Sequence, residues 1–144
     1  MRDKLFLDTN VVIDLLGNRA PFFDSIAKVA TLADKRKLDL AISALSFSTI
    51  FYILSKYEKT DLVKDKLHKL KIICETVDLT DKIIEKSLVS HFTDFEDALQ
   101  YYAASNADCK IIITRNGKDF KESDIPVMTA DEYLSSLKTK KTIK

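Results

Sequence analysis

The sequence has few of the residues that break or cross-link a chain. Its 144 residues include two glycines, two prolines, two cysteines and no tryptophan. Gly17 and Gly117 are far apart, which excludes a glycine-rich phosphate-binding loop and a dinucleotide-binding fingerprint. Cys74 and Cys109 are too few for a zinc site of cysteines or a disulfide framework, so we expect reduced, partly buried thiols. Loops should be short and linkers few.

The sequence also lacks an excess of charge of either sign and a long apolar run. Its 23 basic and 22 acidic side chains leave a formal net charge of +1, which argues against a basic nucleic-acid-binding coat and a disordered acidic tail. No apolar run reaches the about 20 residues that span a bilayer, and Asp3 and Asp8 interrupt the region where a secretory signal would lie. We therefore expect one cytoplasmic globular domain over residues 1–137 and a basic flexible tail over 138–144.

Apolar segments of two periodicities alternate along the chain. Short apolar runs predict strands at residues 4–8, 38–44, 73–79, 110–114 and 125–128. Apolar residues at helical spacing, with their capping signals, predict helices at 10–16 with Asn10 as the cap, from Pro21, from Ser46 or Ser48 to Tyr57, and at 61–71, 83–90, 95–107 and 130–137. This alternation predicts an α/β sandwich around a mostly parallel sheet.

Acidic residues fall where the strands of such a sheet end. Asp8 closes the first strand, Asp119 follows the fourth, and Asp94, Glu96 and Asp97 begin the helix that leads into the fourth. Sites in open α/β sheets form beyond the carboxyl ends of the strands, so we expect these carboxylates at one rim. Clustered carboxylates raise one another's pKa unless a cation neutralises them, and Mg²⁺ and Mn²⁺ take oxygen ligands. Such a site can activate water and hold a phosphodiester.

Each of these acids also has a purely structural interpretation. Asp8 is placed to cap the helix that follows it. Asp94, Glu96 and Asp97 suit the positive end of a helix dipole, and Asp119 suits a turn. The residues taken alone leave both interpretations open.

The remaining titratable residues indicate no second site. Asp14 is expected to face solvent or to pair with Arg19. His68 is expected on a solvated, lysine-rich helix face, and His91 on the surface or as a hydrogen-bond donor near the acids. With only these two histidines, no Ser-His-Asp or Cys-His arrangement is indicated.

Three motifs together resemble the PIN-domain nucleases. Residues 7–14 (LDTNVVID) look like the opening motif of that family, residues 97–99 (DAL) resemble its second acidic motif, and residues 113–120 (ITRNGKDF) resemble its third. Their order and spacing agree over essentially the whole chain. Residues 94–100 (DFEDALQ) look like one bacterial branch of toxin components, similar to VapC-type proteins.

The resemblance implies a three-layer α/β/α domain with a central parallel sheet of about five strands. It implies Mg²⁺- or Mn²⁺-dependent cleavage of RNA by the toxin of a toxin–antitoxin pair, with an antitoxin partner and a homodimer. Carried over by position, Asp8 and Asp97 bind the metal directly. Asp119 binds it directly or through water, and Asp94 and Glu96 add charge.

The same resemblance implies supporting residues around the acids. Thr114 and Asn10 would orient Asp8 by hydrogen bonds, and Thr9 and Asn116 belong to the same surrounding layer.

Basic residues near the rim are expected to attract the RNA backbone. Arg115 is placed to bind a phosphate with both arms of its guanidinium, and Lys118 and Lys121 lie nearby. Solvated surface lysines are the structural alternative.

Two positions depart from the family pattern. Thr49 stands where many members carry a glutamate, and Asn116 stands where many carry an acid directly after Thr-Arg. Fewer carboxylates bind a metal more weakly, so the alternative is a catalytically weak or inactive module that binds RNA or a protein partner. A phosphatase-like or receiver-like domain, in which Asp8 accepts a phosphoryl group, is a second alternative.

Overall fold

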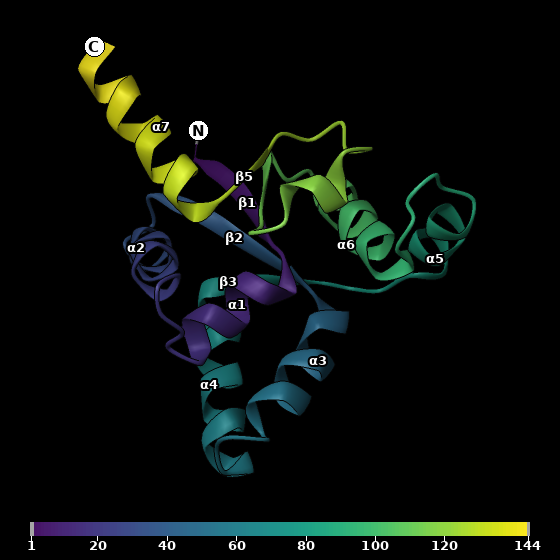
Figure 1. Cartoon of the computed structure of the whole chain (residues 1–144), viewed down its shortest axis with the longest axis horizontal. Helices are drawn as coiled ribbons and strands as arrows, with labels where there is room; N and C mark the ends of the chain where they lie inside the picture. Colours follow the sequence, from purple (N-terminus) through teal and green to yellow (C-terminus); the bar gives the residue numbers. More distant parts are fainter. Residues whose placement is uncertain (1, 144) are drawn as a thin grey trace.

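A computed structural model describes the backbone of residues 2–143 and the side chains of residues 2–139, with a five-stranded sheet between two layers of helices (Figure 1). All strand pairs are parallel, in the order β3-β2-β1-β4-β5. The strands are β1 (Asp3–Leu7), β2 (Leu38–Ser43), β3 (Cys74–Val77), β4 (Ile111–Ile113) and β5 (Val127–Met128). The parallel sheet predicted from the alternating pattern is confirmed.

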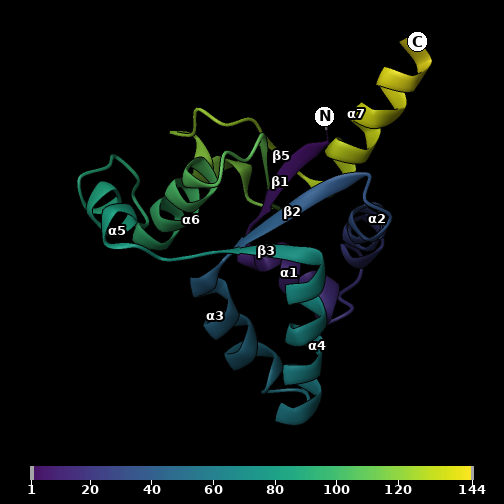
Figure 2. The same ribbon diagram turned by 180° about the vertical axis from the view of Figure 1, so that it is seen from behind.

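Helices connect the strands and cover both faces of the sheet. They are α1 (Thr9–Leu16), α2 (Phe23–Asp34), α3 (Ala44–Leu54), α4 (Thr60–Ile73), α5 (Asp81–Leu88), α6 (Phe95–Asn106) and α7 (Ala130–Ile143), with a 3₁₀ turn, η1 (Gly117–Phe120). Helices α5 and α6 lie on one side of the sheet and α2 and α7 on the other (Figures 1 and 2). Helix α7 continues beyond its predicted end at Leu137 through the segment for which a tail was expected.

Alternate residues of the central strand enter two separate cores. Leu5 and Leu7 pack in a core with residues of α1 to α4 and α7. Phe6 points to the opposite face, where it packs with residues of α5, α6 and η1. All three side chains are fully buried, and replacing Phe6 by alanine is expected to cost about 3–5 kcal/mol. The two cores confirm the three-layer α/β/α sandwich.

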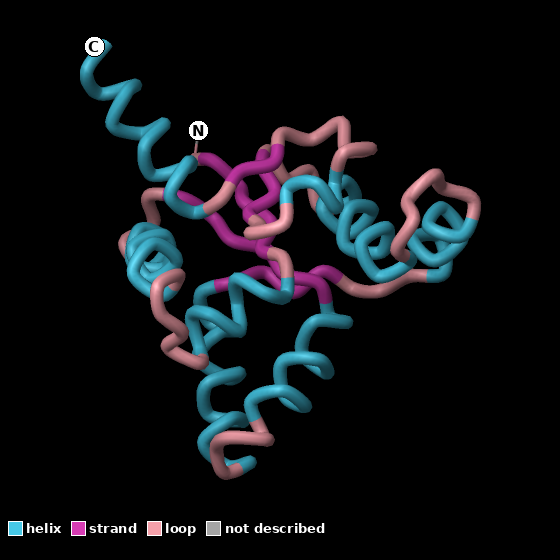
Figure 3. Tube along the Cα trace, in the orientation of Figure 1, coloured by secondary structure: helices cyan, strands magenta, loops and turns pink. Residues whose placement is uncertain are grey.

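The chain turns from strand to helix at the carboxyl end of the sheet (Figure 3). Asp8 has an extended backbone directly after β1, and its side chain accepts a hydrogen bond from the Thr9 amide. The Ser43 hydroxyl caps α3 and the Asp94 carboxylate caps α6 in similar ways. The prediction that Asn10 caps the first helix was wrong, because Asp8 is the last extended residue before that helix.

The sequence also led us to expect reduced, buried cysteines and no membrane-spanning segment. Cys74 and Cys109 are buried and unpaired, as predicted, and burial raises the pKa of each thiol to about 12. Within the part of the chain that the structure describes, none of the helices has both the length and the apolar character of a membrane span.

Candidate active site

Asp8 lies at the centre of the carboxyl end of the sheet. Its backbone amide donates to the Ile113 carbonyl of β4 at 3.0 Å, which joins the ends of β1 and β4. Its Oδ2 accepts a 2.7 Å hydrogen bond from the Thr114 hydroxyl, and its Oδ1 accepts one of 2.8 Å from the Thr9 amide. Only 7% of Asp8 is exposed. Two donors from different segments therefore fix the direction of this carboxylate.

Hydrogen bonding and burial act on Asp8 in opposite directions. Burial is the largest influence and raises the pKa of Asp8 above its usual range, with a smaller rise from the nearby Asp119. The hydrogen bonds from Thr114 and Thr9 lower the pKa, and Arg115 lowers it slightly. The net rise means that the folded protein holds this charge at a cost that a neighbouring cation would relieve.

The acids of α6 belong to the same electrostatic cluster. Burial is the largest cause that raises the pKa of Asp97, and together with Asp94, Asp119, Asp8 and Glu96, in that order, it brings this pKa to about 7. The pKa of Glu96 is raised by burial and then by Asp94 and Asp8. The structure therefore brings the five acids named from the sequence into mutual influence at one rim.

The donor chemistry of this cluster fits a hard divalent cation, although the side chains do not form a finished site. No group of three His, Cys, Asp or Glu side chains within residues 2–139 is close enough to hold a metal ion. Each Asp8 oxygen accepts a single hydrogen bond from Thr9 or Thr114 and keeps a second lone pair for a ligand bond. Burial and repulsion from the neighbouring acids raise the pKa of Asp97 and so disfavour its charged form, which a bound cation would favour. Sharing one ion requires the carboxylates to move closer together.

The structural interpretation of two acids is confirmed, and the role expected for Asn10 is not. The Asp94 carboxylate accepts from the Asp97 backbone amide at 3.1 Å, so the capping interpretation holds for Asp94 as it does for Asp8. Within the described part of the chain Asn10 makes no hydrogen bond to Asp8, and the Thr9 amide makes it instead. The backbone N–H of Asn116 donates to the Thr114 hydroxyl at 3.1 Å, so the main chain at this position, rather than the Asn116 side chain, supports Asp8 through Thr114.

A cleft of about 400 Å³ adjoins the acids. Its walls include Asp97 and Asp119 together with Lys118, Lys121 and His91. Both lysines and the histidine are exposed. The cleft therefore offers positive charge beside the carboxylates, where the phosphates of a bound strand would need it.

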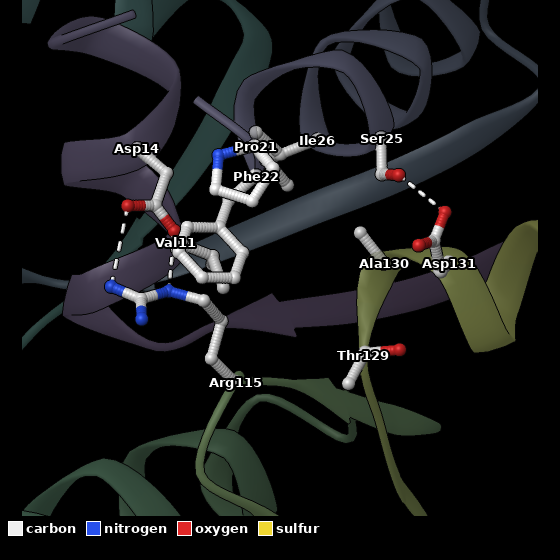
Figure 4. Close-up of a pocket in the computed structure, with 10 residues that line it drawn as sticks. All are labelled: Val11, Asp14, Pro21, Phe22, Ser25, Ile26, Arg115, Thr129, Ala130 and Asp131. Carbon is white, nitrogen blue, oxygen red and sulfur yellow. Dashed lines mark hydrogen bonds and ion pairs between the residues drawn. The ribbon is translucent and has the colours of Figure 1, made fainter. Parts of the chain in front are cut away.

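Arg115 points away from this cleft and toward α1. Its Nε donates to Oδ2 of Asp14 at 2.7 Å and its Nη2 donates to Oδ1 at 3.3 Å (Figure 4). Its guanidinium also lies 4.0 Å from the ring centre of Phe22. The fork expected to bind phosphate is engaged by Asp14, because Asp14 is 1% exposed and needs a partner. Of the two expectations for Asp14, exposure to solvent was wrong, and pairing with Arg19 is confirmed by an ion pair of 3.7 Å between Arg19 Nε and Asp14 Oδ1.

Figure 4 shows the cavity that this ion pair borders. Its volume is about 270 Å³, and its walls come from α1, the start of α2, Arg115 and the start of α7. On the far side Ser25 and Asp131 hydrogen-bond to each other. The Arg115–Asp14 ion pair and the Ser25–Asp131 hydrogen bond therefore lie at two edges of a mainly apolar cavity.

Sequence reasoning missed a buried polar cluster directly behind Asp8. The cluster consists of Thr9 of α1, Ser46 of α3 and Gln100 of α6, joined by hydrogen bonds. The available signal was Gln100 itself, a polar residue between Leu99 and Tyr101 on a helix that is otherwise apolar toward the core. Thr49, the position of the missing glutamate, is half-buried on the same helix as Ser46.

The fold agrees with comparisons to known proteins. A family model described as PIN domain matches residues 4–118, so the chain belongs to the PIN-domain family. Ribonuclease VapC1 of Aquifex aeolicus (strain VF5) is 30% identical over 136 residues, which cover 91% of this chain and 93% of that protein. The resemblance inferred from the three motifs is thereby confirmed.

Solved structures share the fold at lower identity. A toxin–antitoxin complex from Klebsiella pneumoniae matches with a TM-score of 0.65 and 23% identity, covering 88% of this chain and 97% of that chain. Mycobacterium tuberculosis VapC20, a Sarcin-Ricin loop cleaving toxin, matches with a TM-score of 0.64 and 13% identity, covering 80% and 92%. These likenesses establish the architecture.

Proposed function

We propose that this chain is a divalent-metal-dependent endoribonuclease and the toxin of a toxin–antitoxin pair. The observation that carries the proposal is the buried Asp8 carboxylate, oriented by Thr114 and electrostatically coupled to Asp97 and Asp119. The similarity to a protein named as a ribonuclease over nearly the whole chain supports the activity.

Different residues would bind the metal, orient Asp8 and attract the RNA during phosphodiester cleavage. Asp8, Asp97 and Asp119 would hold Mg²⁺ or Mn²⁺, with Glu96 adding negative charge. When bound, the ion supplies Lewis acidity that activates water and neutralises phosphate charge. Thr114 and the Thr9 amide keep Asp8 pointing toward the rim, and Lys118 and Lys121 attract the RNA backbone into the cleft.

The partners belong to the proposal as well. Two of the similar structures are described as toxin–antitoxin complexes or assemblies of VapBC proteins, which supports an antitoxin partner. A homodimer remains a prediction from the resemblance, and a cytoplasmic location remains a prediction from the composition of the sequence.

The alternatives separate on specific observations. The sheet order β3-β2-β1-β4-β5 differs from the 2-1-3-4-5 order of receiver-like domains, which counts against the receiver-like form of the phosphoryl-acceptor alternative. The phosphatase-like form predicts covalent labelling of Asp8 by a phosphoryl donor, which a metal-dependent nuclease does not undergo. The inactive binding module is favoured because positions 49 and 116 carry Thr49 and Asn116 in place of acids. An RNA cleavage assay distinguishes this module from an active nuclease.

The test is cleavage of a mixed RNA pool by the purified full chain with Mg²⁺, with Mn²⁺ and with chelator. Asp8→Asn is the test variant, and Asp108→Asn is the matched control because Asp108 is exposed before β4 at a positive φ that asparagine also adopts. We expect metal-dependent cutting that Asp8→Asn abolishes and Asp108→Asn retains. If the folded wild-type protein cuts RNA with neither metal, the proposed nuclease is wrong and the inactive binding module becomes the favoured function.

A further inference from the structure

Three buried polar side chains form a closed triangle behind the acidic rim. The hydroxyl oxygens of Thr9 and Ser46 lie 2.7 Å apart and share a hydrogen bond. The Gln100 Nε2 donates to Thr9 Oγ1 at 3.1 Å and to Ser46 Oγ at 3.0 Å. Ser46 and Gln100 are 0% and 1% exposed, and Thr9 is buried as well. Hydrogen bonds shielded from water to this degree hold their partners tightly.

The triangle joins the two segments that carry the principal acids. Thr9 follows Asp8, and its amide donates to the Asp8 carboxylate at 2.8 Å. Gln100 lies three residues after Asp97, one helical turn along α6. The bond from Gln100 to Thr9 therefore ties the helix of Asp97 to the segment that aims Asp8, and Ser46 adds the start of α3 as a third anchor.

Stability alone does not account for a glutamine at this position. Gln100 Oε1 is buried and has no hydrogen-bond partner among the described residues. Reversing the amide would give Oε1 a hydroxyl hydrogen but leave Nε2 short of partners, so either orientation leaves part of the amide unsatisfied. An apolar side chain of similar length would fill the space without this penalty. What the amide contributes, and an apolar side chain cannot, is the pair of hydrogen bonds that it donates to Thr9 and Ser46.

We infer that Gln100 is a positioning residue for the acidic site, acting through Thr9 to hold Asp8 at a fixed place relative to Asp97. The inference rests on the proposed function, because it assigns Gln100 a role at the proposed metal site. Residues that orient a metal ligand typically change metal affinity or activity about 10- to 100-fold when replaced.

The test compares Gln100→Met, Thr9→Val and the double variant in the full-length chain. Gln100→Met keeps the length of the side chain and removes both donated hydrogen bonds. The matched control is Ser87→Ala, because Ser87 is a buried residue of α5 whose hydroxyl donates to the Ile83 carbonyl at 2.8 Å, outside the triangle. Two quantities are measured: the Mn²⁺ dissociation constant by calorimetry and the hydrogen exchange rate of the Thr9 amide. Denaturant unfolding of every variant gives the stability against which both are judged.

The expected result is Mn²⁺ binding about 10- to 100-fold weaker in both single variants. The double variant should bind no more weakly than either single variant, because both changes break the same link. Ser87→Ala should bind Mn²⁺ like the wild type, and the Thr9 amide should exchange faster in Gln100→Met than its stability loss explains. Thr9→Val tests the same link if Gln100→Met does not fold.

Wild-type Mn²⁺ affinity in Gln100→Met, or losses that simply add in the double variant, would overturn the inference. Failure of the proposed function gives a different result, in which Mn²⁺ affinity depends on Gln100 but the wild-type protein cuts no RNA. If the wild type binds no Mn²⁺, the exchange of the Thr9 amide decides: an unchanged rate in Gln100→Met refutes positioning.

Discussion

Arg115 and Asp14 form a two-bond ion pair that fastens the loop after β4 to α1. The shorter bond, from Nε to Oδ2, is 2.7 Å long, and Asp14 is almost completely buried. Arg115 directly follows Thr114, whose hydroxyl holds Asp8. The pair thus anchors the loop that supplies the main hydrogen bond of the candidate site.

Removing the arginine from this pair should destabilise the protein. Arg115→Met leaves the Asp14 carboxylate buried with only the more distant Arg19 nearby. We expect a loss of about 3 kcal/mol, the lower part of the range for breaking a buried pair, measured by urea unfolding. Arg115→Lys should not restore it, because lysine lacks the two-armed geometry. An Arg115→Met variant of wild-type stability with weakened RNA binding would instead make Arg115 a substrate-binding residue.

Thr114 should affect metal binding more than fold. Thr114→Val keeps the shape of the side chain and removes the 2.7 Å hydrogen bond to Asp8. Mn²⁺ affinity should fall about 10- to 100-fold, whereas Thr114→Ser should retain it. Calorimetric titration with Mn²⁺ measures both, and equal affinities for the valine and serine variants would contradict the role of the hydroxyl.

The cluster should make the metal-free protein less stable as the pH rises. The folded-state pKa of Asp97 is about 7, above its ordinary value of 3.8, so the folded state binds more protons than the unfolded state between these values. Stability in chelator should therefore fall as the pH increases from about 4 to 7, and the raised pKa of Glu96 acts in the same direction.

Asp97→Asn tests the source of this pH dependence. In chelator the variant should be more stable than the wild type at pH 8 and no more stable at pH 4, as measured by thermal melting. Added Mn²⁺ should raise the melting temperature of the wild type and not that of the variant. If the stability difference between Asp97→Asn and the wild type is the same at both pH values, Asp97 does not have a raised pKa in the folded protein.

The cleft lysines should contribute to RNA binding through charge. Lys118→Ala should weaken binding of single-stranded RNA and reduce the slope of log K against log salt by about 0.7, the change expected when one fewer phosphate is neutralised. Lys64→Ala is the control, because Lys64 is an exposed lysine of α4 away from the cleft. Fluorescence anisotropy at several salt concentrations measures the slope, and equal slopes for both variants would remove Lys118 from the interface.

The fold was predictable because its signals are local. A strand or helix is indicated by a pattern of several apolar residues, so one atypical residue does not hide it. The structure has β4 within the apolar run 110–114 and α6 within the helix-spaced segment 95–107. Element ends were less predictable because capping depends on backbone conformation. Asn10 and Asp8 are both good capping residues, and the end of β1 decides for Asp8.

The clustering of the acids was predictable because parallel strands end at one edge. Their partners were not, because contacts such as Arg115 with Asp14 join residues far apart in the sequence. An arginine beside a cluster of acids suits phosphate binding as well as an internal ion pair, and only the burial of Asp14 decides between them. The link from Gln100 to Thr9 likewise depends on how α6 packs against the start of α1.

The proposed function requires Asp8 and Asp97 to hold the same divalent cation. Its most direct test is the Mn²⁺ dissociation constant of the wild type, Asp8→Asn, Asp97→Asn and the double variant, measured by calorimetry at pH 8. We predict one Mn²⁺ equivalent for the wild type, strongly weakened binding in each single variant, and a double variant scarcely weaker than the singles, because either substitution already removes the shared site. Wild-type affinity in either single variant would contradict the claim.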